Sequence, residues 1–216
     1  MRFRNREHAA ELLLERLRAN YKNQNPLVLG IPRGAVPMAK IIAEGLGGEL
    51  DVVLVHKLSH PHQPELAIGA IDEEGNAFVS QWALNLGPEF LETEKDHQFE
   101  VLRRRRAKYT PLRAPIDPRR RIVIVVDDGI ATGSTMLAAL RAVRAKRPKK
   151  LIGAVAVASG EAARAMLREC DEMVCLKIPA EFYAVGQFFA DFGQVCDEEV
   201  IASLRETQQK MVANGN

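Results

Sequence analysis

Two adjacent carboxylates and a small hydroxyl-rich turn are the residues best suited to do chemistry. Asp127 and Asp128 follow the run Ile-Val-Ile-Val-Val at 122–126 and precede Gly-Ile-Ala-Thr-Gly-Ser-Thr at 129–135. The five apolar, mostly β-branched residues are typical of a strand buried on both faces of a parallel sheet. Ligands of such sheets bind beyond the carboxyl ends of the strands. We therefore expect both acids to face a crevice.

The turn after the acids predicts a phosphate site. Residues 136–145 have helix-forming composition, so residues 131–135 place backbone N–H groups and three hydroxyls at a helix N-terminus. Carboxylates beside a phosphate need another partner, such as hydroxyls or a divalent cation. A ribose 5-phosphate would meet both requirements, with its hydroxyls on the acids and its phosphate on the turn. The alternative is an ordinary strand-turn-helix with a capping Asp or Thr. Two acids near a core are costly without a ligand, which argues against that alternative.

The same stretch resembles the 5-phosphoribosyl 1-pyrophosphate (PRPP) motif of type I phosphoribosyltransferases. The resemblance implies an α/β fold with a twisted, mainly parallel sheet flanked by helices, and a small hood from the chain ends. It implies transfer of the phosphoribosyl group between PRPP and a small nitrogenous base, with release of pyrophosphate and with Mg²⁺ as cofactor. Asp127 and Asp128 would hold the ribose 2- and 3-hydroxyls. The 5-phosphate would lie on Ala131, Thr132, Gly133, Ser134 and Thr135.

Two further basic residues follow predicted strands. Pro32, Arg33 and Gly34 lie in a turn after the strand 27–31, where glycine allows close approach and arginine suits phosphate oxygens. In the resembled family this position is the pyrophosphate loop. A tight turn with a surface arginine is the alternative. Lys57 is expected to end a second strand, 52–55, and to open a polar loop, 57–65; by the same likeness it would contact pyrophosphate.

The segment 179–192 is rich in aromatic residues and resembles the base-stacking region of 6-oxopurine phosphoribosyltransferases. Phe182 or Tyr183 could stack on a base, and Asp191 could join Asp127 and Asp128 near magnesium. Aromatic packing beneath a loop is the alternative. Two departures leave the acceptor open. The purine enzymes carry an aspartate where this chain has Ala131, and a lysine where it reads Ala-Ser-Gly at 158–160.

Other features set the class of protein. With 216 residues, 47% hydrophobic and 27% charged, the chain suits a single soluble domain over 1–216. It shows no membrane span or signal peptide, and its three cysteines suggest no disulfide framework, so we expect a cytoplasmic protein. His60 and His62 make a weak zinc pattern without a third ligand.

Alternating strands and helices predict a parallel sheet with right-handed crossovers. A hairpin is predicted for 67–71 and 77–79, and a frayed tail from 210. The expected helices cover 6–19, 88–109, 136–145 and 161–168, and another follows Gly-Ala-Val-Pro at 34–37 and runs to about 46. The remaining strands cover 152–157 and 173–176.

Net charge is only +2, and the basic runs are 103–106 and 119–121. The first lies among acids in a predicted helix, so a solvated face or an intersubunit contact, as in a homodimer, is the ordinary explanation. The alternative function is a non-catalytic PRPP or nucleotide sensor that binds RNA or protein. The acidic residues near the basic runs disfavour binding to nucleic acid.

Overall fold

Five parallel strands form the main sheet, in the order β2-β1-β6-β7-β8. The computed structural model describes residues 2–80, 83, 85–111 and 114–214. Hydrogen-bonded register runs from β1 to β6 and from β6 to β7, so the carboxyl ends of these strands share one edge. This confirms the predicted α/β class. The strands are β1 (Leu27–Gly30), β2 (Glu49–Val52), β6 (Ile122–Ile130), β7 (Lys150–Ala158) and β8 (Glu172–Lys177).

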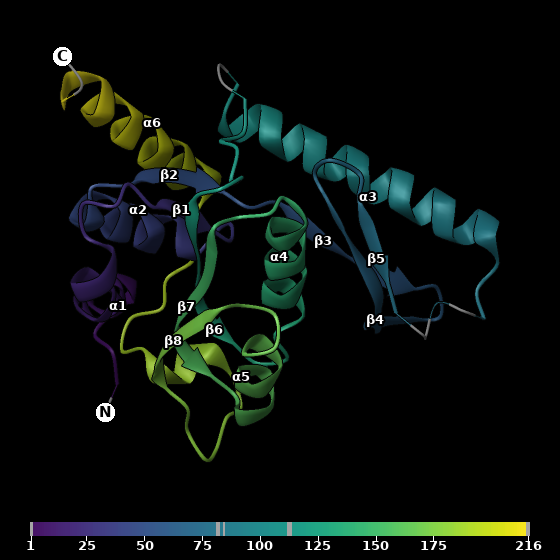
Figure 1. The fold of residues 1–216 in the computed structure, drawn as a ribbon. Coiled ribbons are helices and arrows are strands. Elements are labelled where there is room, and N and C mark those ends of the chain that lie inside the picture. The colour runs from purple at the N-terminus through teal and green to yellow at the C-terminus, as the bar shows by residue number, and fades with distance from the viewer. Residues whose placement is uncertain (1, 81–82, 84, 112–113, 215–216) are drawn as a thin grey trace.

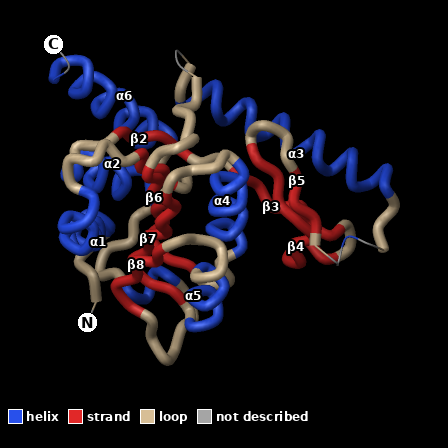
Figure 2. Tube along the Cα trace, viewed as in Figure 1, coloured by secondary structure: helices blue, strands red, loops and turns tan. Residues whose placement is uncertain are grey.

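Helices cover both faces of this sheet because its strands are apolar on both faces (Figures 1 and 2). Successive side chains of a strand point to opposite faces. Accordingly, Ile124 and Val126 of β6 pack into one core, while Val123 and Val125 pack into the other. The first core is covered by α1 (Arg6–Tyr21), α2 (Ala35–Leu46) and α6 (Asp197–Asn214), and the second by α4 (Ser134–Ala145) and α5 (Gly160–Met166).

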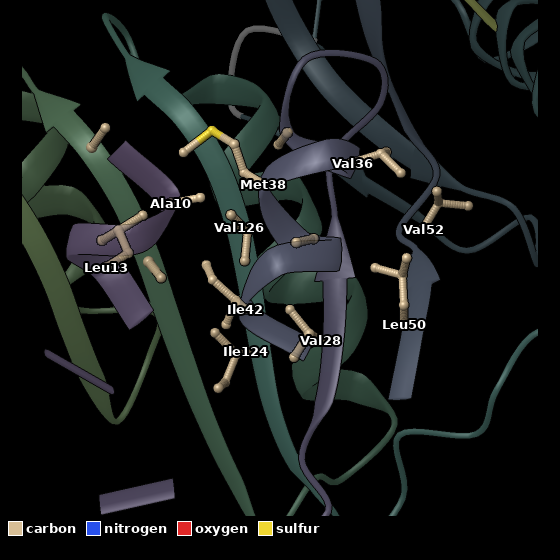
Figure 3. Close-up of a cluster of buried hydrophobic side chains, with 14 of the residues drawn as sticks. Ala10, Leu13, Val28, Val36, Met38, Ile42, Leu50, Val52, Ile124 and Val126 are labelled. Atoms are coloured by element: carbon tan, nitrogen blue, oxygen red, sulfur yellow. The ribbon is translucent and has the colours of Figure 1, made fainter. Parts of the chain in front are cut away.

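The core beneath α1 and α2 fixes the two strands that carry the predicted loops. Figure 3 shows Leu13 of α1 and Met38 and Ile42 of α2 packing toward Val28 and Ile124 of the sheet. All five side chains are buried. The helix α2 ends at Gly47, whose φ of 68° is a left-handed conformation that favours glycine. This packing holds the ends of β1 and β6 side by side.

A second, antiparallel sheet and the long helix α3 (Pro88–Tyr109) form an arm beside α4 (Figure 1). The arm's strands are β3 (Val55–His60), β4 (Gln63–Asp72) and β5 (Ala77–Val79). The predicted hairpin and the predicted helix 88–109 are confirmed. The predicted second strand is displaced, because β2 covers Glu49–Val52 and not 52–55, and the predicted polar loop 57–65 is wrong because β3 and β4 occupy it. Val53 and Leu54 are buried where the chain leaves the main sheet, so their apolar character reflects burial rather than strand pairing.

Arg106 joins the arm to the main sheet. Its guanidinium donates to Asp51 Oδ1 at 2.8 Å, to both carboxylate oxygens of Glu73 and to the carbonyl of Val52 at 3.0 Å. Asp51 also accepts from the Ile116 N–H at 3.0 Å. Because the Asp51 side chain is only 1% exposed, its charge depends on these partners.

The chain ends contribute unequally to the predicted hood. The N-terminal segment pairs with the segment after β8: Phe3 exchanges backbone hydrogen bonds with Phe188 and Ala190, both 2.8 Å, and Asp191 donates to the Arg4 carbonyl. The C-terminal helix α6 instead packs on α2 and β2. This helix runs through residues 210–214, where the sequence predicts a frayed tail.

Candidate functional site

The acid pair lies in the last residues of β6, which continues to Ile130 instead of ending at 126. Asp127 stands opposite Val155 of β7 and remains within the parallel ladder. Its Oδ1 accepts the Asp128 N–H at 2.9 Å. Since neighbouring side chains of a strand point to opposite faces, the two carboxylates meet different surroundings. The predicted juxtaposition at the strand's carboxyl end is therefore present, but the two acids are not equivalent.

Electrostatics differ between the two acids. Desolvation, followed by the charge of Asp128, raises the pKa of Asp127 well above its usual value. Desolvation also raises the pKa of Asp128, but the hydrogen bond and charge of Arg6 oppose that rise. Asp128 is therefore the acid with a cation beside it, and Asp127 the acid whose negative charge is less well supported.

Arg6, at the first position of α1, is the site residue that sequence reasoning missed. Its Nε donates to Asp128 Oδ2 at 2.8 Å, and its Nη1 donates to the Gly193 carbonyl at 2.6 Å. The guanidinium carbon lies 3.8 Å from the centre of the Phe192 ring. The Arg6 and Asp128 side chains are only 15% and 14% exposed. No local motif marks this arginine, because its partner is 122 residues away in the sequence.

The predicted phosphate loop forms an exposed turn that leads into α4. Ala131, Thr132, Ser134 and Thr135 are exposed around buried Gly133. Gly133 has a φ of 78°, which side chains rarely adopt, and it precedes the first residue of the helix. The first N–H groups of α4 have no partner within the helix, so they are suited to an anion.

The neighbouring turn after β7 supports this loop. Ser159 Oγ donates to the Ala131 carbonyl at 2.7 Å and accepts from the Ala162 N–H, where it caps α5. The Ser159 side chain at this position is therefore engaged in holding the phosphate loop and in capping α5.

The predicted pyrophosphate loop comes from β1, the strand next to β6. Ile31 donates to the Val126 carbonyl at 3.0 Å, and the Pro32–Arg33 peptide bond is cis. Arg33 is exposed. A Cβ on Gly34 would lie 2.5 Å from Asp128 Oδ2, so glycine is what lets this loop approach the acid pair. The structure thus brings the predicted pyrophosphate loop against the acid pair through Gly34 and Asp128.

Groups from α3 and α6 lie near Arg33. The pKa of Asp197 is lowered by the hydrogen bond from Lys108, at 2.6 Å, and then by that from the Tyr109 hydroxyl, at 2.7 Å, with a smaller effect of the Arg33 charge. Desolvation, with the Asp197 hydrogen bond, raises the pKa of Tyr109 to about 12. Arg33 is therefore one member of a mixed-charge surface.

Lys57 does not end a strand of the main sheet; it lies within β3 of the arm, exposed, and pairs with Ala70. Ala70 lines a groove between the arm and the start of α4. The groove is lined by Gly69, Ala70, Phe78, Val79, Ser80, Ser134, Leu137, Ala138 and Arg141. Because Ser134 also belongs to the predicted phosphate loop, β3 runs near this side of the site. The expected loop position of Lys57 is nevertheless wrong.

The aromatic segment separates into packed and exposed rings. Phe182 packs on Phe188, with ring centres 5.3 Å apart, whereas Tyr183 is 82% exposed. Asp191 is exposed, and its Oδ1 accepts from the Gly193 N–H at 3.2 Å. Packing therefore accounts for Phe182, while the Tyr183 ring is free to contact a ligand.

Comparisons with known proteins decide the family. The sequence matches the family described as "Phosphoribosyl transferase domain" over residues 3–191. This chain belongs to that family. Two curated relatives from Mycobacterium tuberculosis, strains CDC 1551 / Oshkosh and ATCC 25618 / H37Rv, are each 37% identical over 216 residues, and their names provisionally call them phosphoribosyl transferases. Each match covers 99% of this chain and 48% of the relative, so the chain spans about half the length of those proteins.

A solved structure extends the likeness of this phosphoribosyl transferase domain to three dimensions. The protein TT1426 from Thermus thermophilus is 44% identical and superposes with a TM-score of 0.86 over 95% of this chain and 99% of its own. Within the described residues, none of the helices combines the length and the apolar character needed to cross a membrane.

Proposed function

We propose that this domain transfers the 5-phosphoribosyl group between PRPP and a small nitrogenous base, with release of pyrophosphate. One observation carries the proposal: a paired acid and an anion-binding helix start lie on one strand-loop-helix unit, against the glycine of the adjacent loop. A Cβ on Gly34 would lie 2.5 Å from Asp128 Oδ2, and Gly133 precedes α4. A sugar phosphate with a diol and a charged leaving group matches these three features.

The residues would divide the ligand between them. The loop 131–135 would take the 5-phosphate through backbone N–H groups and hydroxyls. Asp128 and Asp127 would accept from the ribose hydroxyls and orient the sugar. As pyrophosphate departs, Arg33 would stabilise the negative charge that develops on it. Lys57 would have to reach the same group from the arm, and its pairing with Ala70 beside the groove to Ser134 supports that approach.

Magnesium fits this site as an ion held largely by the substrate. Among the described residues, no group of three or more histidine, cysteine or acidic side chains is arranged to hold a metal. Mg²⁺ often keeps several waters and binds through one or two carboxylates together with phosphate oxygens. Asp127 and Asp128 would supply the carboxylates, and Asp191 would act from the exposed turn at 191–193. Bound there, the ion would neutralise charge on the pyrophosphate.

The acceptor base would lie toward the exposed aromatic segment. Tyr183 offers a solvent-exposed ring for stacking on a planar base. Ala131 carries no acid that could contact the base, and the Ser159 hydroxyl already donates to a carbonyl. These features favour an acceptor recognised by stacking more than by the polar contacts expected for a 6-oxopurine.

The basic run of α3 gives less support to a sensor that binds RNA. Arg106 is enclosed by Asp51 and Glu73, and Arg103 lies 3.0 Å from Glu100. These pairings divide the run, so it presents fewer cations to a phosphate backbone than the sequence suggests.

The decisive experiment incubates the protein with PRPP, Mg²⁺ and a panel of purine, pyrimidine and smaller nitrogenous bases, and measures pyrophosphate release. Turnover with a base, abolished by EDTA and restored by Mg²⁺, supports the transferase. Tight PRPP binding without turnover, together with retention of RNA on a filter, supports the regulator. Absence of PRPP binding by calorimetry contradicts both functions.

A further inference from the structure

Arg6 joins four segments that come from distant parts of the sequence. Its guanidinium contacts Asp128 of β6 and the Gly193 carbonyl, and it lies over the Phe192 ring. A Cβ on Gly34 would lie 3.1 Å from Arg6 Nε, so the loop after β1 also packs against it. The opening helix, the acid-bearing end of β6, the loop after β1 and the segment after β8 therefore converge on one side chain.

We infer that Arg6 is the positioning residue for Asp128: it holds this carboxylate in the orientation that receives the ribose diol. The inference rests on the proposed function, since it assigns a role within the same ribose site. It also assigns to the N-terminal helix a part in sugar recognition that neither the PRPP motif nor the pyrophosphate loop supplies.

The geometry of the guanidinium explains why an arginine suits this role. Nε donates to Oδ2 of Asp128, while Nη1 is fixed by the Gly193 carbonyl, so the planar group cannot turn without losing one bond. Stacking on Phe192 restricts it further. Arg6 holds Oδ2, and the Asp128 carboxylate also accepts from the Gly129 N–H; the remaining lone pairs of this carboxylate can accept from a ribose hydroxyl. Arg6 thus offsets the cost of a largely buried charge and sets its direction at once.

The start of α1 is itself fixed, which gives Arg6 a firm base. Asn5 caps the helix by accepting from the His8 N–H at 2.9 Å, and Leu13 and Leu17 on the following turns are fully buried. The Arg4 carbonyl accepts from Asp191 at 2.9 Å. The backbone around Arg6 is therefore held from both sides of the site.

The test compares Arg6→Met, Arg6→Lys and Arg4→Met with the unaltered protein. Calorimetry measures the affinity for ribose 5-phosphate and, separately, for pyrophosphate, and circular dichroism records melting. Arg4→Met is the matched control, because it removes an arginine whose side chain is 76% exposed and whose Nη2 lies 3.9 Å from Glu11 Oε2. We expect Arg6→Met to weaken the binding of ribose 5-phosphate at least tenfold and the binding of pyrophosphate less than twofold. Arg6→Lys should lose less affinity for ribose 5-phosphate, because it keeps a positive charge beside Asp128. Arg4→Met should change neither affinity.

Several outcomes would overturn the inference. Unchanged ribose 5-phosphate binding by Arg6→Met would show that Asp128 needs no positioning. Tighter binding would make Arg6 a competitor that occupies the place of the diol. Equal weakening of both ligands, with a lower melting temperature, would assign Arg6 to folding. If the unaltered protein binds neither ligand, the proposed function itself fails, a result distinct from a defect confined to the variants.

Discussion

Neutralising the two acids separately should have opposite effects on stability. Asp127 lacks the direct cation partner that Asp128 has in Arg6, and desolvation and the charge of Asp128 raise its pKa. Asp127→Asn removes the disfavoured charge, and the amide oxygen can still accept the Asp128 N–H. Asp128→Asn instead leaves Arg6 without its carboxylate, at a position where both side chains are about one-seventh exposed.

The magnitudes follow from burial and partners. Relieving an unfavourable charge typically adds about 0.5–2 kcal/mol to the free energy of unfolding. Losing an ion pair costs about 0–1 kcal/mol at the surface and about 3–5 kcal/mol when buried, so we expect Asp128→Asn to cost about 1–3 kcal/mol. For a domain of this size, each kcal/mol corresponds to about 2–4 °C in Tm. The two variants should therefore melt on opposite sides of the unaltered protein.

The pH dependence of stability gives an independent test of the sign expected for Asp127→Asn. Between the usual pKa of an aspartate, about 4, and the raised pKa of Asp127, the folded protein holds a proton that the unfolded chain has lost. The free energy of unfolding therefore falls as pH rises through this interval. The advantage of Asp127→Asn should grow from pH 5 to pH 8.

Calorimetric melting of both variants at pH 5 and pH 8, without ligand, tests this reasoning, and pyrophosphate release should be largely lost in each. A lower Tm for Asp127→Asn at pH 8, or equal shifts for the two variants, would refute the assignment of Arg6 to Asp128 alone. Retained activity per folded molecule would show that the acids serve as scaffolding.

Four other substitutions test the remaining parts of the site and the attachment of the arm. Gly133→Val should abolish PRPP binding by calorimetry, because its φ of 78° disfavours a β-branched residue and a Cβ would lie 3.3 Å from that of Ala162; unchanged affinity would remove the phosphate assignment. Arg33→Ala and Lys57→Ala should weaken PRPP and pyrophosphate by about 1.5–3 kcal/mol, or roughly ten- to hundredfold, but ribose 5-phosphate much less; equal losses for all three ligands would contradict a leaving-group role. Arg106→Met should lower the free energy of unfolding in urea by about 3–5 kcal/mol, because it leaves buried charge unpaired; a loss below about 1 kcal/mol would show that the arm is held by apolar packing alone.

Local patterns predict most strands of the main sheet, although β2 covers Glu49–Val52 and not 52–55. The run 122–126 is apolar throughout because both faces of β6 are covered, and this run, with the alternation of strands and helices, predicts a parallel strand. Hairpin residues around 72–76 and the proline that opens α3 at 88 are equally local signals. These elements form where the sequence predicts them because propensity, pattern and burial agree.

The arm and the acid pair show where local patterns cease to inform. Lys57 lies in a strand because β3 pairs with β4 and packs Leu58 into the core, a tertiary effect that overrides the polar composition of 57–65. Asp127 and Asp128 look alike in sequence, yet alternation along β6 and the distant Arg6 make them different. The arginine that makes the two acids different lies 122 residues from Asp128, beyond the reach of a local pattern.

The acid pair therefore depends on non-local contacts for its chemistry. Placing two carboxylates at a buried strand end is unfavourable, and the fold offsets this chiefly for Asp128, through an arginine that lies 122 residues away in the sequence. The other acid keeps its unfavourable surroundings in the absence of ligand. A diol or a divalent cation would relieve that acid most, so binding a sugar phosphate should stabilise the fold by more than its phosphate contacts alone. The same unfavourable charge that lowers stability in the free protein would then favour the bound state.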